Sequence, residues 1–148
     1  MHVSYQQEEK NMAVVKELIR MEVDGTISFG DFSLAAKSKL DNFKYNGDLY
    51  KVKTFREITK LERNGMFVYE SVPGTSVNNL RVAEDGMTFN VEGAEDAEIT
   101  LGLEEVREYQ ITVNETTVGQ MKTNLGGKLT LSVELEKDKE VKVIVTKL

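Results

Sequence analysis

Apolar and polar residues alternate in short runs along most of this 148-residue chain. In "KLTLSVEL" at 128–135 the apolar residues occupy every second position, which places them on one face of an extended strand. The same period of two runs through "MFVYESV" at 66–72 and "VKVIVTKL" at 141–148. This period indicates half-buried β-strands, because successive side chains of a strand point to opposite faces of a sheet.

Turn dipeptides separate these runs. A two-residue hairpin turn of type I′ needs positive φ at both central residues, which Asn, Asp and Gly adopt most readily. Four such dipeptides lie between apolar runs: Asp24-Gly25, Asn46-Gly47, Asn64-Gly65 and Asp85-Gly86. We therefore expect four hairpins, and a two-residue turn at Asn64-Gly65 would set Leu61 opposite Val68. "NET" at 114–116 matches the acceptor triplet for N-glycosylation, but we interpret it as a further hairpin turn.

The stretch "VPGT" at 72–75 predicts a tight turn, with Pro73 at its first central position and Gly74 supplying the positive φ of a type II turn. We place a boundary there and predict an all-β chain, in which a small N-terminal β meander over 12–75 precedes an immunoglobulin-like β-sandwich over 76–148. Seven strands are expected in the second part, at 79–83, 87–92, 97–103, 108–113, 118–123, 128–135 and 140–147.

Residues 1–11, "MHVSYQQEEKN", are polar and without a period, and they end just before Met12. A purine-rich run that resembles a ribosome-binding site can encode Glu8-Glu9-Lys10. We therefore interpret residues 1–11 as a mis-assigned N-terminal extension and Met12 as the natural start.

The stretch "RMEVDGTISFGDF" at 20–32 fits part of a calcium-loop template. Asp24 falls at position 5 of the loop, Gly25 at its glycine and Asp31 at position 12, and the flanks at 12–20 and 32–40 could form amphipathic helices. Arg20, however, stands where the first carboxylate should bind Ca²⁺. We therefore favour a hairpin with strands near 14–23 and 26–32, and keep a degenerate EF-hand-like calcium loop as an alternative.

Composition narrows the class of protein. Apolar residues make up 40% of the chain and charged residues 30%, as in soluble globular proteins. The net charge of −6 disfavours nucleic acid and anionic membrane as partners, since both attract positive charge. There is no cysteine, and no apolar run is long enough for a signal peptide or a membrane span. We expect a cytoplasmic protein.

Few residues support catalysis or cofactor binding. His2 is the only histidine, so a Ser-His-Asp triad and histidine metal sites are not expected. "NLGG" at 124–127 lacks the lysine and the spacing of a phosphate-binding loop. Tyr45, Tyr50 and Tyr69 could form a platform for stacking sugars, although packing in a core is the favoured interpretation. We expect no catalytic residue, no metal and no cofactor, and we favour a binding function over an enzymatic one.

Charge is unevenly distributed along the chain. Residues 37–63 contain eight basic and four acidic residues, whereas 84–108 contain nine acidic residues and one basic residue. A molecule with such charge asymmetry can associate head to tail. The expected basic interaction face consists of Lys37, Lys39, Lys44, Lys51, Lys53, Arg56, Lys60 and Arg63. The expected acidic interaction face consists of Glu84, Asp85, Glu92, Glu95, Asp96 and Glu98.

Three stretches resemble a group of small proteins from Gram-positive anaerobic bacteria that carry the label endosialidase. They are "MAVVKELIR" at 12–20, "YKVKTFREITKLERNGMFVYESVPGT" at 50–75 and "KTNLGGKLTLSVEL" at 122–135. The resemblance implies hydrolysis of sialic-acid polymers. It assigns no catalytic residue to this chain.

Together these features predict a non-catalytic all-β module for binding or self-assembly. Exposed strand edges and opposite charges would make its contacts, and a homo-oligomer is the expected assembly. The alternative is a carbohydrate-associated protein that binds glycan or hydrolyses it with a pair of carboxyl groups. The calcium loop at 20–32 is the third hypothesis.

Overall fold

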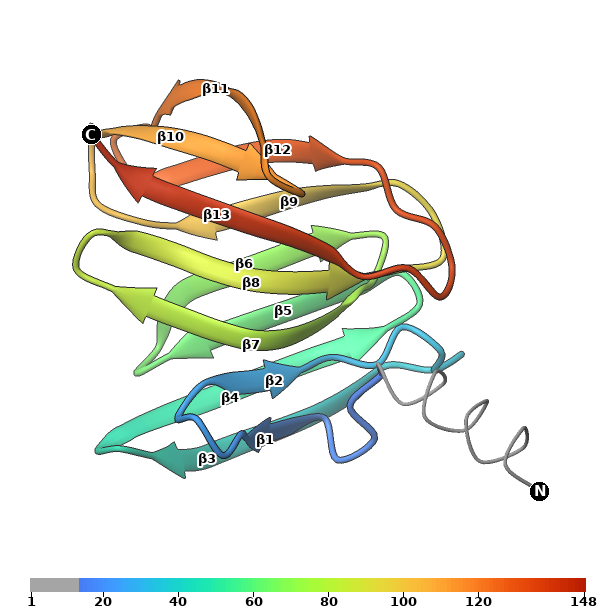
Figure 1. Cartoon of the computed structure of the whole chain (residues 1–148). Helices are drawn as coiled ribbons and strands as arrows, with labels where there is room; N and C mark the ends of the chain where they lie inside the picture. Colours follow the sequence, from blue (N-terminus) through green and yellow to red (C-terminus); the bar gives the residue numbers. More distant parts are fainter. Residues whose placement is uncertain (1–13) are drawn as a thin grey trace.

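The computed structural model describes residues 14–148, which form strands β1–β13 and no helix. The strands make two antiparallel sheets that pack face to face, so the all-β prediction is confirmed (Figure 1). The described residues include no helix long and apolar enough to cross a membrane. The extension expected at 1–11 lies outside the described residues.

The first sheet has seven strands in the order β1-β2-β7-β8-β13-β10-β11. In that order its strands are Ile19–Met21, Ile27–Phe29, Ser76–Ala83, Gly86–Glu92, Val141–Lys147, Glu108–Val113 and Thr116–Lys122. The second sheet has six strands in the order β12-β9-β6-β5-β4-β3. Its strands are Lys128–Val133, Ala97–Gly102, Met66–Val72, Ile58–Arg63, Asp48–Phe55 and Ser38–Tyr45. The seven strands expected after residue 75 are all present, with ends shifted by a few residues.

Strands from both sides of residue 75 share both sheets. β2 pairs with β7 in the seven-stranded sheet, and β6 pairs with β9 in the six-stranded sheet. One continuous hydrophobic core lies between the sheets. The expected boundary between 12–75 and 76–148 therefore does not separate the sheets or the core.

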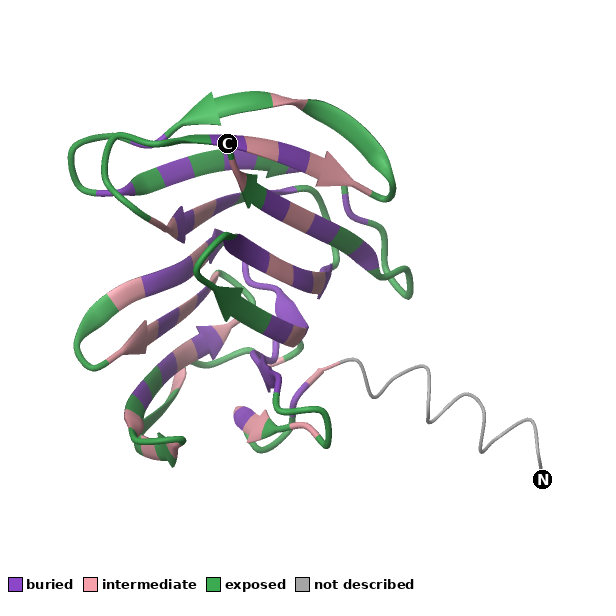
Figure 2. Ribbon diagram, turned by 60° about the vertical axis from the view of Figure 1, so that its left-hand side comes forward, coloured by how far each residue is buried: buried purple, intermediate pink, exposed green. Residues whose placement is uncertain are grey.

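Every second side chain of most strands points into this core, which gives the alternating bands of burial in Figure 2. Tyr69 lies at its centre, with its ring edge-to-face against Phe29 at 5.3 Å and Phe89 at 5.6 Å between ring centroids. The Tyr69 hydroxyl lies 2.8 Å from the Thr75 hydroxyl, which in turn lies 2.7 Å from that of Ser71. Burial raises the pKa of Tyr69. These buried hydroxyl groups satisfy one another's hydrogen bonds.

All four predicted hairpins are present, but only two of them have the predicted two-residue turn. At Asp24-Gly25 only the glycine has positive φ, and the loop is longer than two residues because Met21 pairs with Ile27. Asn46-Gly47 and Asn64-Gly65 have positive φ at both residues, as type I′ requires. Asn114-Glu115 also has positive φ at both residues and joins β10 to β11, so "NET" forms a turn. The loop at Asp85-Gly86 is displaced by one residue, because Ala83 pairs with Gly86 and leaves Glu84-Asp85 between them.

Two local predictions are wrong. Leu61 pairs with Tyr69 and not with Val68, because a β-bulge shifts the register after Leu61. The turn at 72–75 is not of type II, since the Val72–Pro73 peptide bond is cis and Gly74 lacks positive φ. Gly74 is needed for a different reason: a Cβ there would overlap the carbonyl oxygen of Phe55.

The stretch 20–32 forms a hairpin, so the helix–loop–helix interpretation is wrong. β1 pairs with β2, and the Asp24 carboxylate accepts hydrogen bonds from the backbone N–H of Thr26 at 3.0 Å and from its hydroxyl at 2.6 Å. These bonds hold the pKa of Asp24 below its ordinary value. Asp31 accepts a bond from the backbone N–H of Ser33 at 3.0 Å. Across residues 14–148, no group of three or more His, Cys, Asp or Glu side chains could hold a metal ion.

Candidate functional site

The outer face of the six-stranded sheet carries lysines that stand side by side. Lys39 of β3 pairs with Lys53 of β4, and Lys53 pairs with Lys60 of β5. Neighbouring strands lie about 4.8 Å apart, so these three side chains leave the backbone within about 10 Å. Lys51 precedes Lys53 by two positions and therefore points to the same face. We call Lys39, Lys51, Lys53 and Lys60 the lysine cluster.

The lysine cluster and Glu62 surround a shallow hollow of about 140 Å³. Lys60 makes an ion pair with Glu62 at 3.5 Å. Within residues 14–148, Lys39, Lys51 and Lys53 make no ion pair. Like charges on directly opposite residues of neighbouring strands destabilise a sheet. This part of the face therefore holds more positive charge than the chain itself neutralises.

The row of cross-strand partners that contains Lys39, Lys53 and Lys60 continues across the sheet, but its side chains are no longer basic. Lys60 pairs with Glu70, Glu70 with Thr100, and Thr100 with Thr130. The two threonine hydroxyls lie 2.9 Å apart and share a hydrogen bond. The outer face thus passes from ammonium groups on β3–β5 to a carboxylate on β6 and hydroxyl groups on β9 and β12.

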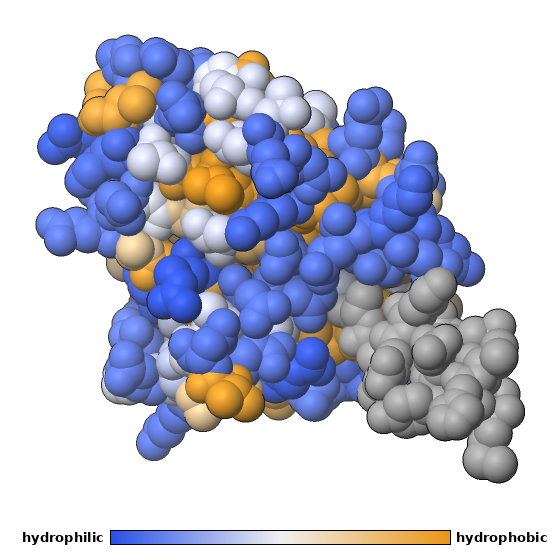
Figure 3. Space-filling view, viewed as in Figure 1, coloured by the Kyte–Doolittle hydropathy of each residue, from blue (hydrophilic) through white to orange (hydrophobic). Residues whose placement is uncertain are grey.

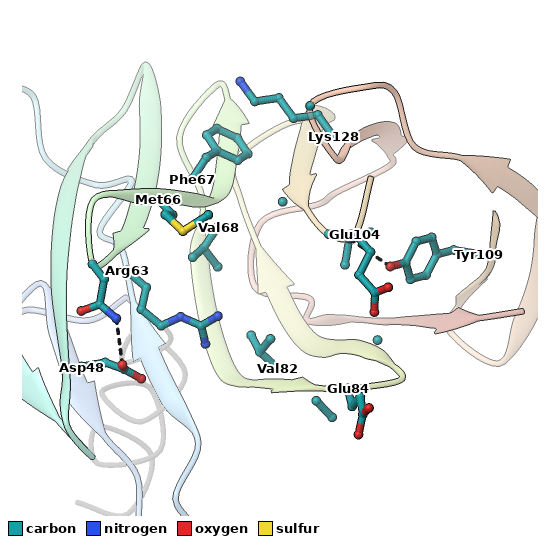
Figure 4. A pocket seen from close by; sticks show the side chains of 16 residues that line it. Asp48, Arg63, Met66, Phe67, Val68, Val82, Glu84, Glu104, Tyr109 and Lys128 are labelled. Carbon is teal, nitrogen blue, oxygen red and sulfur yellow. Dashed lines mark hydrogen bonds between the residues drawn. The ribbon is translucent and has the colours of Figure 1, made fainter. Parts of the chain in front are cut away.

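An aromatic ring lies on this face, between two of its cations. The ammonium nitrogen of Lys128 lies 4.5 Å from the ring centroid of Phe67, and that of Lys60 lies 5.9 Å away. Both are within the range of cation–π attraction. Figure 4 shows the Lys128 side chain beside the ring. The ring is therefore already engaged by the chain's own lysines.

The predicted basic face is only partly assembled. Four of its eight residues form the lysine cluster. Lys37 lies just before β3, and Lys44 lies opposite the exposed Leu49, so both extend the cluster along β3. Arg56 is in the turn between β4 and β5. Arg63 lies opposite Tyr50 on the neighbouring strand and lines a separate cleft.

The predicted acidic residues do not share one face. Glu84 and Asp85 lie in the turn before β8, whereas Glu92 ends that strand, about 20 Å away along an extended chain of this length. Glu95 and Asp96 follow in the loop to β9. Glu98 lies on the outer face of the six-stranded sheet, where it pairs with Val72 and Ser132.

Glu92 is buried, and this burial raises its pKa. The nearby carboxylates of Asp138 and Glu140 raise it further, while a hydrogen bond from the Asp138 backbone lowers it. Burial also raises the pKa of Glu140. The carboxyl groups at this end of the sandwich therefore hold protons more tightly than ordinary glutamates do.

A cleft of about 620 Å³ lies at the other end of β8, where Glu84 and Gly86 line it together with residues of β5, β6 and β7 (Figure 4). Its polar groups are largely engaged. Glu104 makes an ion pair with Lys147 at 2.9 Å, and this contact holds the pKa of Glu104 below its ordinary value. The Tyr109 hydroxyl accepts a hydrogen bond from the backbone N–H of Glu104 at 3.1 Å.

The tyrosines do not form a stacking platform. Tyr50 and Tyr69 are buried in the core, as the favoured interpretation predicted. The Tyr45 hydroxyl donates a hydrogen bond to the carbonyl oxygen of Gly25 at 2.6 Å. Hydrophilic side chains dominate the side of the molecule seen in Figure 3, and its hydrophobic side chains form small separate groups.

Sequence reasoning identified the lysines but missed their alignment. The signal was present in "YKVKTF" at 50–55, where Lys51 and Lys53 occupy alternate positions of a strand, and in Lys60 shortly after the next turn. Pairing these strands through the two-residue turn at Arg56-Glu57 would have placed Lys53 opposite Lys60. Lys128 was missed because it comes from a strand distant in sequence.

No protein-family model, curated protein or solved structure matches this chain. A functional assignment therefore rests on the surface geometry described above. The resemblance to proteins labelled endosialidase stays an expectation.

Proposed function

We propose that this protein is a non-catalytic binding module whose lysine cluster holds an acidic polysaccharide. One observation carries the proposal: four lysine side chains surround a single hollow together with one carboxylate, that of Glu62. Glu62 lies opposite Lys51 on the neighbouring strand and makes an ion pair with Lys60, so one negative charge stands among four positive charges in this part of the described chain. A bound anion would replace repulsion between these lysines with attraction, because the opposite charges would lie within a few ångströms of one another.

The shape and chemistry of the face favour an extended polymer that bears both charges and hydroxyl groups. The row that begins with the lysine cluster continues into Thr100 and Thr130, whose hydroxyl groups can hydrogen-bond sugar hydroxyls. Single-stranded nucleic acid would need free aromatic rings on which bases stack. Phe67 is engaged by lysines, which argues against that class. A carboxylated glycan is also the class that the resemblance implies.

Two features favour binding over hydrolysis. Glu62 is the carboxylate that lines the hollow, and it is engaged in an ion pair with Lys60. In the separate cleft, Glu104 is held by Lys147. Glycoside hydrolysis uses one carboxyl group that stays protonated and a second that stays ionised, both beside the bond to be cleaved. Glu92 and Glu140, whose pKa values are raised, lie at the opposite end of β8 from this cleft.

The proposal is tested by measuring affinity for polysialic acid and dextran sulfate at low salt, with neutral dextran as a control ligand. The double variant Lys53→Gln/Lys60→Gln should bind both acidic polymers at least about 10-fold more weakly, since counterion release makes each lost contact costly. Lys142→Gln is the matched control, because Lys142 is exposed on β13 of the other sheet. It should bind like the wild type.

Affinity for the acidic polymers should also fall as salt rises. Equal affinity of the double variant and the wild type would contradict the proposal. So would tighter binding of single-stranded DNA than of either polysaccharide, or release of shorter chains from polysialic acid during the assay.

A further inference from the structure

β12 is the least protected edge of either sheet. It ends the six-stranded sheet, pairs with β9 alone among the described strands, and keeps one register over its whole length (Figure 1). The other edges carry features that hinder pairing: β1 has three residues, and β3 and β11 both contain register shifts. Short strands and bulges block edge-to-edge contact, whereas a regular edge strand invites it.

The backbone of β12 has hydrogen-bonding groups that the rest of the described chain leaves unused. The Leu103 N–H donates to the Gly127 carbonyl, so Gly127 is a hydrogen-bonded position of the ladder with β9. Such positions alternate along an antiparallel pair. The backbone N–H and C=O groups of odd-numbered residues of β12 therefore point towards β9, and those of even-numbered residues point away from it. The outward groups of Lys128 are taken by Asn124, whose side-chain oxygen accepts from the Lys128 N–H. The outward N–H and C=O groups of Thr130 and Ser132 have no partner within residues 14–148.

The sequence of this edge is complementary to itself. If two copies of β12 lie antiparallel with Leu131 opposite Leu131, Thr130 of each copy faces Ser132 of the other. In this register the unused backbone groups of both residues meet and can form a ladder between the copies. Lys128 then lies opposite Glu134 on the outer face, twice in the pair. A shift by two residues would place Lys128 opposite Ser132 in one direction. In the other direction it would place Lys128 opposite Glu136, which lies beyond β12 and is already paired with Lys139.

The side chains on the core-facing side of β12 are also compatible with this register. Leu129, Leu131 and Val133 are buried in the core of each copy, and in this register Leu129 lies opposite Val133. Apolar side chains on directly opposite residues of neighbouring strands stabilise a sheet by packing together. The hydrophobic layer of one copy would therefore continue into that of the next.

We infer that two copies of this chain pair through β12 about a two-fold axis at Leu131. The two six-stranded sheets join into one continuous sheet, and both lysine clusters face the same side of it. The inference does not depend on the proposed function, since backbone complementarity and the Lys128–Glu134 match carry it without any ligand.

Sedimentation equilibrium of the full chain tests the inference. The wild type should show a reversible dimer with twice the monomer mass of 16.7 kDa. Lys128→Glu and Glu134→Lys should each weaken the dimer at least about 10-fold, because each places like charges opposite each other at two contacts. The combined variant K128E/E134K restores opposite charges and should recover the dimer. Lys142→Glu, on the other sheet, should leave it unchanged.

Hydrogen exchange locates the contact independently of charge. The amides of Thr130 and Ser132 should exchange more slowly at high protein concentration than at low concentration, while β3 and β11 should show no such difference. A monomer at every concentration would overturn the inference, as would a dimer that the combined variant fails to recover. Protection of β3 or β11 in place of β12 would also overturn it. Circular dichroism of each variant confirms that it is folded before its mass is compared.

Discussion

Replacing Lys53 by Gln should make the unliganded protein more stable. Lys53 stands between Lys39 and Lys60, one strand spacing from each, and has no ion pair of its own in the described chain. Gln keeps much of the length and the polarity of the side chain but removes its charge. The variant therefore removes two like-charge contacts while leaving the register of β4 unchanged.

The expected gain follows from the geometry. Cross-strand charge pairs and exposed ion pairs contribute roughly 0.2–1 kcal/mol each, so removing two repulsions should raise the free energy of unfolding by about 0.5–1.5 kcal/mol at low salt. For a chain of 148 residues this corresponds to a rise in melting temperature of about 1–6 °C. Lys53→Glu replaces both repulsions with attractions and should gain more than Lys53→Gln.

Urea unfolding at 10 mM and at 1 M NaCl separates this effect from others. The screening length falls from about 30 Å to about 3 Å between these conditions, so the gain should be present at low salt and nearly absent at high salt. The same variant should bind polysialic acid more weakly than the wild type does. Stability and binding should thus change in opposite directions.

Two results would refute this reasoning. The first is a Lys53→Gln variant that is no more stable than the wild type at low salt. The second is a gain that persists in 1 M NaCl, since a persistent gain would come from packing or strand propensity and not from charge. Lys142→Gln controls for the loss of a lysine elsewhere on the surface, and its stability should change less.

Three further predictions test the fold and its charges. Gly74→Ala should lower the free energy of unfolding by about 3 kcal/mol, because its Cβ would overlap a backbone oxygen that cannot move freely. Gly47 has positive φ but open space around it, so Gly47→Ala should lower the free energy of unfolding by only about 1 kcal/mol. Equal losses for the two variants in urea unfolding would contradict this prediction. Glu115→Gly should raise stability by about 1 kcal/mol, because residue 115 has positive φ in a type I′ turn, and a lower melting temperature would argue against it. Glu92→Gln should make the free energy of unfolding depend less on pH. The folded chain holds the Glu92 proton more tightly than the unfolded chain does. The protonated carboxyl group therefore contributes its full stabilisation below the ordinary pKa of 4.5, and this stabilisation is lost as pH rises through the pKa of Glu92 in the folded chain. If the free energies of unfolding of wild type and variant differ by the same amount at every pH between 4 and 8, this effect of Glu92 is excluded.

Strands and turns could be predicted because their signals are local. Period-two alternation and the Asn-Gly dipeptides depend on neighbouring residues alone, and both identified elements that the structure contains. The bulge at Val68 could not be predicted in this way. Val68 and Tyr69 both belong to the hydrophobic core, although successive side chains of a regular strand point to opposite faces of a sheet. The bulge makes this possible, and it depends on the shape of the core.

The grouping of strands into sheets is a non-local property. Nothing in the runs before and after residue 75 indicates that β2 would pair with β7 or β6 with β9. The lysine cluster depends on the registers of two hairpins, which are local, so it could have been predicted from the sequence. The separation of Glu84 from Glu92 depends on the direction in which β8 crosses the sandwich, so counting charges along the chain could not reveal it.

The position of β13 has a consequence for how the protein is made in the cell. β13 comes last among the described strands, yet it lies inside the seven-stranded sheet, between β8 and β10. Until residues 141–147 have left the ribosome, that sheet exists only as two separate parts with unpaired edges. Folding of this sheet must therefore finish after synthesis of β13, and nascent chains that stall before it would expose edges that aggregate or recruit chaperones.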